Sequence, residues 1–297
     1  MNSIRKIEEE FLGLNHRNVG YIFPSNERKH YKLADDKVES KRILELNDIQ
    51  CARTYAVISK IGNIPGVLEK MKAYKSLAIK PANGSGGEGI KILRKNQDDE
   101  WTEGGKVVDE DALHLYLANI IMGVYSLTST DKILIEECIN PHNCFHDIFP
   151  KGVADFRVIL YKEEIALAML RMPTKKSDGK ANLHQGGIGI GVDINTGKMT
   201  MAYDGEKYTD HHPDTGAKIN GVQLPFWEEI LALSLKTAKH FPLKYLGVDI
   251  VIDKLQGPLV MEVNVRPGLG IQMVNKQGLR PILEKIDEKI KEGGGVN

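Results

Sequence analysis

Two stretches near the C-terminus, Gly247-Val-Asp-Ile-Val-Ile-Asp253 and Pro258-Leu-Val-Met-Glu-Val-Asn-Val265, decide the fold that this sequence encodes. Both are rich in β-branched residues and alternate between two kinds of side chain, which is typical of β-strands. Only Lys254-Leu-Gln-Gly257 separates them, so we predict an antiparallel hairpin. One face of this hairpin is apolar and is predicted to lie in the core: Val248, Ile250, Ile252, Leu259, Met261 and Val263.

The other face of the hairpin is polar. If a four-residue turn closes the hairpin, Asp253 pairs with Pro258, and Asp249 then lies opposite Glu262. Asn264 follows two residues beyond Glu262 and shares its face. Directly opposed residues have Cβ atoms about 4.5–5.5 Å apart, and like charges at that distance destabilise a sheet. Two carboxylates and an amide oxygen therefore indicate a hard cation such as Mg²⁺, with a solvated polar face as the alternative.

A glycine-rich loop, Gly84-Ser-Gly-Gly-Glu-Gly89, follows another predicted strand, Ser76-Leu-Ala-Ile-Lys80. Its glycines allow positive φ angles and let backbone N–H groups approach an anion closely. Lys80 would add a positive charge for phosphate. The next segment, Ile90-Lys-Ile-Leu93, reads as a strand, so this is neither a Walker A loop nor a dinucleotide fingerprint. The loop indicates either a phosphate-binding flap or a flexible hairpin tip.

The composition is that of an ordinary globular protein, with 41% hydrophobic residues among 297. The 40 basic and 40 acidic residues balance, which argues against a general binder of nucleic acid or anionic membranes. No apolar run approaches the roughly 20 residues that span a bilayer. Cys51, Cys138 and Cys144 lack a CxxC spacing, which favours free thiols in a reducing compartment. We therefore expect a cytoplasmic protein.

The order of the predicted elements indicates the α+β class, because antiparallel strands are interspersed with helices without regular βαβ alternation. Residues 11–36 lack clean periodicity and are predicted to be mostly loop. Asp109 is the expected N-cap of a helix. We predict helices over 37–48, 65–73, 109–122, 225–240 and 278–291, and strands over 53–58, 76–80, 90–94, 132–136, 155–161, 164–170, 247–253 and 258–265, with a further hairpin within 188–203.

Seven sequence blocks from about Asp36 to Gly270 resemble the ATP-grasp superfamily, and in particular the RimK-type α-L-glutamate ligases and α-L-glutamate ligase-like proteins. The blocks are Asp36-Lys37, Ile79-Lys80 with Gly84–Ile90, Ile135-Glu-Glu-Cys-Ile139, Asp155-Phe-Arg157, Asn182-Leu-His-Gln-Gly-Gly187, Gly247-Val-Asp-Ile250, and Gly257–Asn264 with Pro267-Gly-Leu269.

The resemblance implies an α+β ATP-grasp fold in which two α+β subdomains clamp ATP between antiparallel sheets. Residues 1–36 would then be an N-terminal extension, and residues 37–297 the ATP-grasp domain. Within that domain, about 50–138 would be the lid subdomain with the glycine flap, and about 139–297 the metal-binding core subdomain.

The resemblance also implies roles for individual residues. Two lysines would contact the ATP phosphates, the glycine loop would close over them, and residues 136–139 would be the hinge that reads adenine or ribose. The cofactor-binding residues would be Lys37, Lys80, Gly84, Ser85, Gly86, Gly87, Gly89, Glu136, Glu137 and Ile139. The metal ligands, for Mg²⁺ with Mn²⁺ as an alternative, would be Asp249, Glu262 and Asn264, and the catalytic residues Arg157, Asn182 and Arg266. Arg171 is a further candidate for stabilising a phosphorylated intermediate.

Several of these residues have a structural alternative. Lys37 precedes a helix and would otherwise be a surface cation. Glu136 and Glu137 would otherwise solvate a strand end, and Arg157 would pair with Asp155. The histidines receive no catalytic role: His184 is predicted to be a loop residue, His211-His212 an exposed turn, and the spacing of His142, Cys144 and His146 matches no usual zinc pattern.

The resemblance implies an ATP- and Mg²⁺-dependent ligase that joins a carboxylate to an amine through an acyl phosphate, with an amino acid such as glutamate as the expected substrate. Its partners would be ATP and the carboxylate and amine substrates, without nucleic acid or a membrane span, and a homo-oligomer stays open. The alternatives are a phosphotransferase, a ligase of envelope or sugar-linked substrates, and a non-catalytic ATP-binding regulator. The short segment 1–36 and an insertion at about 140–153 leave the substrate open.

Overall fold

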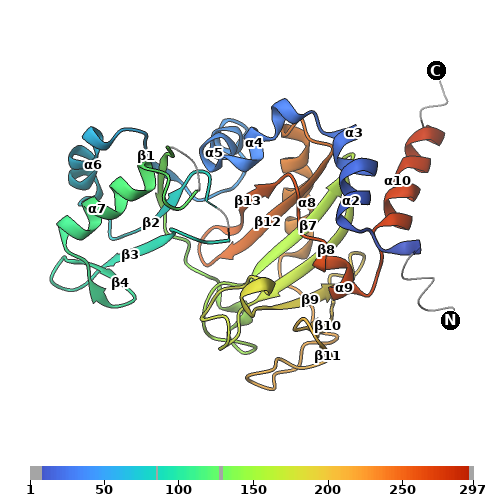
Figure 1. Ribbon diagram of the computed structural model, residues 1–297. Helices are drawn as coiled ribbons and strands as arrows, with labels where there is room; N and C mark the ends of the chain where they lie inside the picture. The colour runs from blue at the N-terminus through green and yellow to red at the C-terminus, as the bar shows by residue number, and fades with distance from the viewer. Residues whose placement is uncertain (1–8, 85, 127–129, 294–297) are drawn as a thin grey trace. The chain divides into compact units, whose positions relative to one another are not determined.

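A computed structural model describes residues 9–84, 86–126 and 130–293, and Figure 1 shows its helices and strands. The chain forms two compact units. The first contains the residues up to Ala34, Asn47–Gln50 and the residues from Asn140 on, and the second contains Asp35–Leu46 and Cys51–Ile139. The extension, lid and core roles that the sequence suggests for residues 1–36, about 50–138 and about 139–297 stay proposals.

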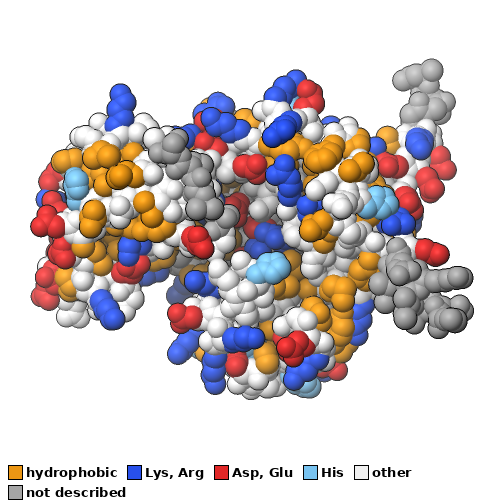
Figure 2. Space-filling model, in the orientation of Figure 1, with side chains coloured by type: hydrophobic (Ala, Val, Ile, Leu, Met, Phe, Trp, Pro, Cys, Tyr) orange, Lys and Arg blue, Asp and Glu red, His pale blue; other side chains and the backbone are white. Residues whose placement is uncertain are grey.

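Charged side chains of both signs are interspersed over the face of the molecule seen in Figure 2, which agrees with the balanced net charge. No helix among the described residues is long and apolar enough to cross a membrane.

The second unit is built on a six-stranded antiparallel sheet in the order β1-β6-β2-β3-β4-β5. Its strands are β1 (Thr54–Ile58), β2 (Ser76–Pro81), β3 (Lys91–Lys95), β4 (Trp101–Glu103), β5 (Lys106–Val107) and β6 (Ile133–Glu137). Its helices are α5 (Lys37–Leu46), the 3₁₀ helix η3 (Ile61–Asn63), α6 (Ile64–Met71) and α7 (Glu110–Ile121).

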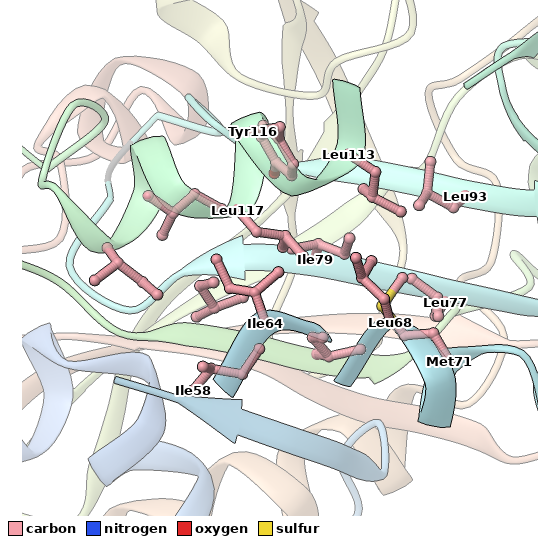
Figure 3. Packing of buried hydrophobic residues seen from close by; sticks show 14 residues of the cluster. Ile58, Ile64, Leu68, Met71, Leu77, Ile79, Leu93, Leu113, Tyr116 and Leu117 are labelled. Carbon is pink, nitrogen blue, oxygen red and sulfur yellow. The ribbon is translucent and has the colours of Figure 1, made fainter. Parts of the chain in front are cut away.

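One face of this sheet is apolar and carries the core of the unit. Figure 3 shows the strand residues packed against α6 and α7, with Leu77, Ile79 and Leu93 from the sheet and Leu68, Met71, Leu113 and Leu117 from the helices. The predicted N-cap of α7 is confirmed, because the Asp109 carboxylate accepts a hydrogen bond from the backbone N–H of Ala112 at 2.7 Å. Strand alternation directs Lys80 and Glu136 to the opposite face.

The first unit is built on a seven-stranded antiparallel sheet in the order β11-β10-β9-β8-β7-β12-β13. Its strands are β7 (Asp155–Tyr161), β8 (Glu164–Met172), β9 (Ile188–Val192), β10 (Met199–Tyr203), β11 (Tyr208–Thr209), β12 (Tyr245–Asp253) and β13 (Gly257–Asn264). Helix α8 (Trp227–His240) packs on its apolar face, and the rings of Phe156 and Trp227 lie 6.4 Å apart there. From Asn140 on, the unit also contains η4 (Asn143–Phe145), η5 (Leu183–Gln185), α9 (Gly270–Asn275) and α10 (Arg280–Gly293). The two sheets confirm the α+β class.

The hairpin β12–β13 has a tighter turn than the sequence predicts. Asp253 pairs with Gly257 and not with Pro258, so that part of the predicted register is wrong by one residue. The tighter turn is possible because Gly257 adopts a φ of +74°. In addition, the Asp253 carboxylate accepts hydrogen bonds from the backbone N–H groups of two turn residues, at 2.8 and 3.1 Å.

A β-bulge restores the predicted pairing farther along the same hairpin. Ile250 pairs with Val260, whereas Asp249 pairs with Glu262, so β13 holds one extra residue between the two pairs. The pairing of Asp249 with Glu262 is therefore confirmed. Met261 is the extra residue, and it is half-buried and not in the core as predicted.

The prediction that residues 11–36 are mostly loop is wrong. The segment consists of short helices: α2 (Leu14–Arg17), the π-helix η1 (Asn18–Ile22), α3 (Phe23–Ser25), η2 (Arg28–His30) and α4 (Lys32–Asp35). Long-range hydrogen bonds hold it in place. The buried Asn26 side chain exchanges two hydrogen bonds with the backbone of Tyr245, at 2.7 and 2.9 Å. The buried Arg17 donates to the carbonyl of Pro267 at 2.8 Å.

Candidate functional site

A buried ionic group lies on the polar face of the six-stranded sheet, and we call Lys41, Lys80 and Glu136 the lysine cluster. The exposed fractions of these residues are 6%, 8% and 3%. The Lys80 ammonium pairs with Glu136 Oε1, and Lys41 Nζ lies 3.3 Å from Glu136 Oε2. Burial alone would raise the pKa of the Glu136 carboxyl, but Lys80 and Lys41 lower it below its usual value. The cluster therefore holds two ammonium groups on one ionised carboxylate.

Sequence reasoning assigned Glu136 to the adenine hinge and assigned no role to Lys41. The structure places the Glu136 carboxylate against the two lysines, and its role in the hinge stays a prediction. Lys41 lies on the buried side of α5 together with Ser40 and Leu44, a spacing of three and four residues that places side chains on one helix face. That spacing was the available signal, although a lysine on a helix is usually solvated.

Lys37, at the start of α5, reaches the glycine loop. Its ammonium donates to the carbonyl of Gly84 at 2.5 Å, and its backbone N–H donates to the carbonyl of Ala82 at 2.9 Å. The residue before it, Asp36, is buried and begins the helix, because its carboxylate accepts from the backbone N–H of Val38 at 2.9 Å. The predicted lysine is thus held beside the predicted flap.

The glycine loop has the conformational freedom that its sequence suggests. Gly86, Gly87 and Gly89 adopt φ angles of +64°, +78° and +68°. A Cβ atom at Gly89 would lie 2.5 Å from the Tyr125 ring, so a side chain there would clash. Ser85 lies outside the described residues. The loop could therefore present backbone N–H groups to an anion, as predicted.

The two remaining residues predicted for the hinge, Glu137 and Ile139, lie at and just after the end of β6. Glu137 is half-buried, and its backbone N–H donates to the carbonyl of Arg53 at 2.8 Å. Ile139 follows the strand and is also half-buried. Their role in adenine recognition stays a prediction.

A second ionic group lies on the polar face of the seven-stranded sheet, and we call Asp155, Arg157, Arg171 and Asp249 the arginine–carboxylate cluster. Arg157 forms a two-point ion pair with Asp249, at 2.8 Å from Nε to Oδ1 and 2.6 Å from Nη2 to Oδ2. Arg171 Nη2 donates to Asp249 Oδ2 and to Asp155 Oδ2, both at 2.8 Å. Two of these pairs join neighbouring strands, β7 with β12 and β8 with β7, and the pair of Arg171 with Asp249 reaches from β8 across β7 to β12.

The arginines fix the charge state of Asp249. Burial alone would raise the pKa of its carboxyl, but Arg157 and Arg171 outweigh burial and lower the pKa to about 2. Burial raises the pKa of the Asp155 carboxyl, with Arg171 opposing this change. Although burial acts in the other direction, Asp155 and Asp249 raise the pKa of the Arg171 guanidinium. Asp249 is therefore an ionised carboxylate whose two oxygens already accept hydrogen bonds.

These contacts bear on two sequence interpretations. The alternative in which Arg157 pairs structurally with Asp155 is not what the structure contains, because Arg157 pairs with Asp249. Asp155 pairs with Arg171 instead. Asp155, to which sequence reasoning assigned no role, completes the cluster by pairing with Arg171. Its position two residues before Arg157 on one strand places both side chains on the same face, and this spacing could have indicated its role.

The predicted metal ligands form an oxygen donor set on one face of the hairpin. Glu262 lies opposite Asp249, and Asn264 pairs with Gly247, two residues farther along both strands. Among the described residues, no hydrogen-bond partner is present for the buried Nδ2 atom of Asn264. These donors fit Mg²⁺, which prefers oxygen ligands, and Asp249 Oδ1, which accepts one hydrogen bond, retains a lone pair for it. Among the described residues no group of three His, Cys, Asp or Glu side chains suits a metal, so the amide of Asn264 would be required.

The two other predicted catalytic residues occupy different environments. Asn182 caps the short helix η5, since its side chain accepts from the backbone N–H of His184 at 3.0 Å. Arg266 is exposed, and its guanidinium carbon lies 5.0 Å from the centre of the Tyr31 ring. Their catalytic roles stay predictions.

The prediction that His211-His212 is an exposed turn holds for His211 only. His212 is buried, stacks on Phe149 at 4.8 Å between ring centres, and lies 3.1 Å from the carbonyl of Pro173. Burial lowers the pKa of its imidazole. The reason is long-range packing against the 140–153 segment, which the local turn pattern does not encode.

That segment lines a cavity of about 220 Å³ together with Met172, Pro173 and Ile252. Met172 follows Arg171, and Ile252 lies three residues beyond Asp249, so both side chains are on the opposite face of the sheet from the arginine–carboxylate cluster. The insertion therefore forms a pocket, but on the face away from the candidate metal ligands.

Comparisons with known proteins agree with this architecture. Residues 16–288 match the family model described as "Sugar-transfer associated ATP-grasp". A curated protein of Pseudomonas fluorescens named "Probable alpha-L-glutamate ligase" is 25% identical over 277 residues, which cover 93% of this chain and 69% of that protein.

Two solved structures share the fold. D-alanine–D-alanine ligase from Bacillus anthracis complexed with ATP has a TM-score of 0.53 at 17% identity, and the match covers 95% of this chain and 75% of that one. The ATP-grasp ligase PsnB complexed with its minimal precursor, Mg and ADP has a TM-score of 0.50 at 12% identity, covering 90% and 62%. The resemblance that the sequence blocks indicate is confirmed.

Proposed function

The chain belongs to the sugar-transfer associated ATP-grasp family, and from this membership and the two ionic clusters we propose that it is an ATP- and Mg²⁺-dependent carboxylate–amine ligase. The family match over residues 16–288 is the observation that carries the proposal. The name of the curated relative supports it, and the two solved structures share the fold.

The proposed reaction has two steps. A substrate carboxylate oxygen attacks the γ-phosphorus of ATP, the bond to the β-phosphate oxygen breaks, and ADP leaves with an acyl phosphate remaining. An amine nitrogen then attacks the acyl carbon, loses a proton, and displaces inorganic phosphate to give an amide. No covalent bond to the protein is required, so electrostatic stabilisation and positioning provide the catalysis.

The chain's own residues would compensate the charge of the triphosphate. Lys80 and Lys37, which belong to the second unit, would donate hydrogen bonds to phosphate oxygens. The glycine loop would add backbone N–H groups. Arg157 would exchange part of its ion pair with Asp249 for a transferred-phosphate oxygen. Bound Mg²⁺, held by Glu262, Asn264 and Asp249, would supply further neutralisation of the phosphate charge.

The direct test is an assay of the purified chain with ATP, Mg²⁺ and a panel of amino acids, peptides and amines. We expect ADP and phosphate in equal amounts, and a product whose mass is that of the two substrates less one water. A phosphorylated product without release of phosphate would indicate a phosphotransferase. Tight ATP binding without turnover by any member of the panel would indicate a regulator.

Two classes of substrate are candidates for this reaction. The curated relative favours an amino acid such as glutamate. The family description favours a second candidate, a carboxylate or amine carried on a sugar. Adding uronic acids and amino sugars to the panel separates them, because the product mass identifies which substrate has been joined.

A further inference from the structure

Lys41 and Lys80 differ in how much of their hydrogen-bonding capacity the protein uses. The Lys41 ammonium donates to the carbonyl of Ala52, lies beside Glu136 Oε2, and hydrogen-bonds the Cys51 thiol. An ammonium group has three donors, so Lys41 is saturated. Among the described residues, the Lys80 ammonium pairs only with Glu136 Oε1. Lys80 thus retains donors for a ligand, whereas Lys41 does not.

The net charge of the lysine cluster also favours the binding of a ligand, and specifically of an anion. Two buried ammonium groups face one carboxylate, which leaves one positive charge in excess. A buried charge without a partner is costly, so the excess is best satisfied by an anion from outside the cluster. A polyphosphate is such an anion.

The geometry links the two lysines through Glu136. Glu136 lies on β6 directly opposite Ala78 of β2, and Lys80 is the next residue on the same face of that strand. Lys41 comes from α5 and binds the other carboxylate oxygen. The Glu136 carboxylate is therefore held by one lysine at each oxygen: Lys41 at Oε2 and Lys80 at Oε1. Because Lys41 fixes the carboxylate, Oε1 in turn fixes the position of the Lys80 ammonium.

We propose that Lys41 is a positioning residue for nucleotide binding, which holds the Glu136 carboxylate so that Lys80 presents its remaining donors to the phosphates. This inference rests on the proposed function. Lys41 contacts no phosphate itself and acts through Glu136 and Lys80.

The test is isothermal titration of Mg-ADP into the full chain and into Lys41→Met, Lys80→Met and the double variant. We expect Lys41→Met to weaken ADP binding about tenfold, and the double variant to bind no more weakly than Lys80→Met alone, because the effect of Lys41 passes through Lys80. Lys41→Met removes the excess positive charge and leaves a one-to-one ion pair, so the fold should persist. Thermal unfolding checks this, and Lys41→Gln serves as a second variant.

Lys72→Met is the matched control, because Lys72 is an exposed lysine of the same unit whose ammonium pairs with Glu69 at the surface. It should bind ADP as the wild type does. Unchanged binding by Lys41→Met, or losses that multiply fully in the double variant, would overturn the inference and leave the proposed function standing. A wild-type chain that binds no ADP would instead remove the proposed function, and this inference with it.

Discussion

The two sheets of this protein have the same arrangement of faces but differ in the charged groups that they carry. Each has one apolar face covered by helices and one face that carries an ionic cluster. The lysine cluster holds two cations on one carboxylate. The arginine–carboxylate cluster holds two arginines against two aspartates, with the Glu262 carboxylate opposite one of them. The first group is suited to an anion and the second to a cation.

Under the proposed function, this difference would supply the two kinds of group that a magnesium nucleotide requires. A triphosphate needs positive charge from the protein, and its metal needs carboxylate and amide oxygens. Strand alternation allows both, because a sheet can bury one face in the core and leave alternate positions for charge.

The largest effect is expected where the charge balance of the first unit is broken. Replacing Asp249 with Ala leaves the buried Arg171 and the half-buried Arg157 without their shared carboxylate. Removing one partner of a buried ion pair typically costs about 3–5 kcal/mol, so we expect the free energy of unfolding to fall by that amount. Urea unfolding followed by circular dichroism measures it, and an unchanged midpoint would show that Asp249 is not held as described.

The second prediction distinguishes the role of Glu262 from that of Asp249, although the two residues are directly paired in the hairpin. Glu262 is half-buried, and Gln keeps the shape of its side chain, so Glu262→Gln should change stability much less than Asp249→Ala. If Glu262 binds the metal of the nucleotide, ATP turnover should fall by about 10²–10³-fold. ADP release is the readout, with Glu163→Gln, an exposed glutamate of the same unit, as the control. Near-normal turnover would contradict the metal assignment.

A third prediction concerns pH. The folded state lowers the pKa of Asp249 from 3.8 to about 2, because Arg157 and Arg171 stabilise its charged form. The associated stability is present above the unfolded pKa and is lost as the pH falls from about 4 towards 2, by about 2 kcal/mol. The raised pKa of the Asp155 carboxyl has the opposite effect on the free energy of unfolding, and that effect occurs at higher pH. Urea midpoints between pH 5 and 2 test this, and a flat profile would count against it.

The smallest effect provides a control in the second unit. Asp109→Ala removes the N-cap of α7 and should cost about 1 kcal/mol of unfolding free energy. Helix α7 packs on the apolar face, away from the lysine cluster. ADP binding at a temperature well below unfolding should therefore stay unchanged, and weaker binding would mean that the two faces are not independent.

The features predicted from sequence are those with a local pattern. The opposition of Asp249 and Glu262 follows from alternation along two adjacent strands, and it survives a shorter turn because the bulge at Met261 compensates. The cap at Asp109 follows from its position before an apolar run. Such patterns need no knowledge of distant segments.

The features that were missed depend on distant partners. Lys41 is buried against Glu136, which lies far along the chain and pairs with its ammonium. The helices of residues 11–36 lack periodicity, and Asn26 and Arg17 anchor them to the backbone of Tyr245 and Pro267. His212 is buried by packing on Phe149. Propensity and periodicity contain none of these contacts, so tertiary structure overrides the local pattern.

The most direct test of the central claim follows the oxygen atoms of the substrate. With a carboxylate that supports ADP release, both carboxyl oxygens are labelled with ¹⁸O, and the released phosphate is analysed by mass spectrometry. Formation of an acyl phosphate predicts that one labelled oxygen passes from the carboxylate to each phosphate. Phosphate without label, or AMP and pyrophosphate in place of ADP, would contradict a ligase that activates its carboxylate by phosphorylation.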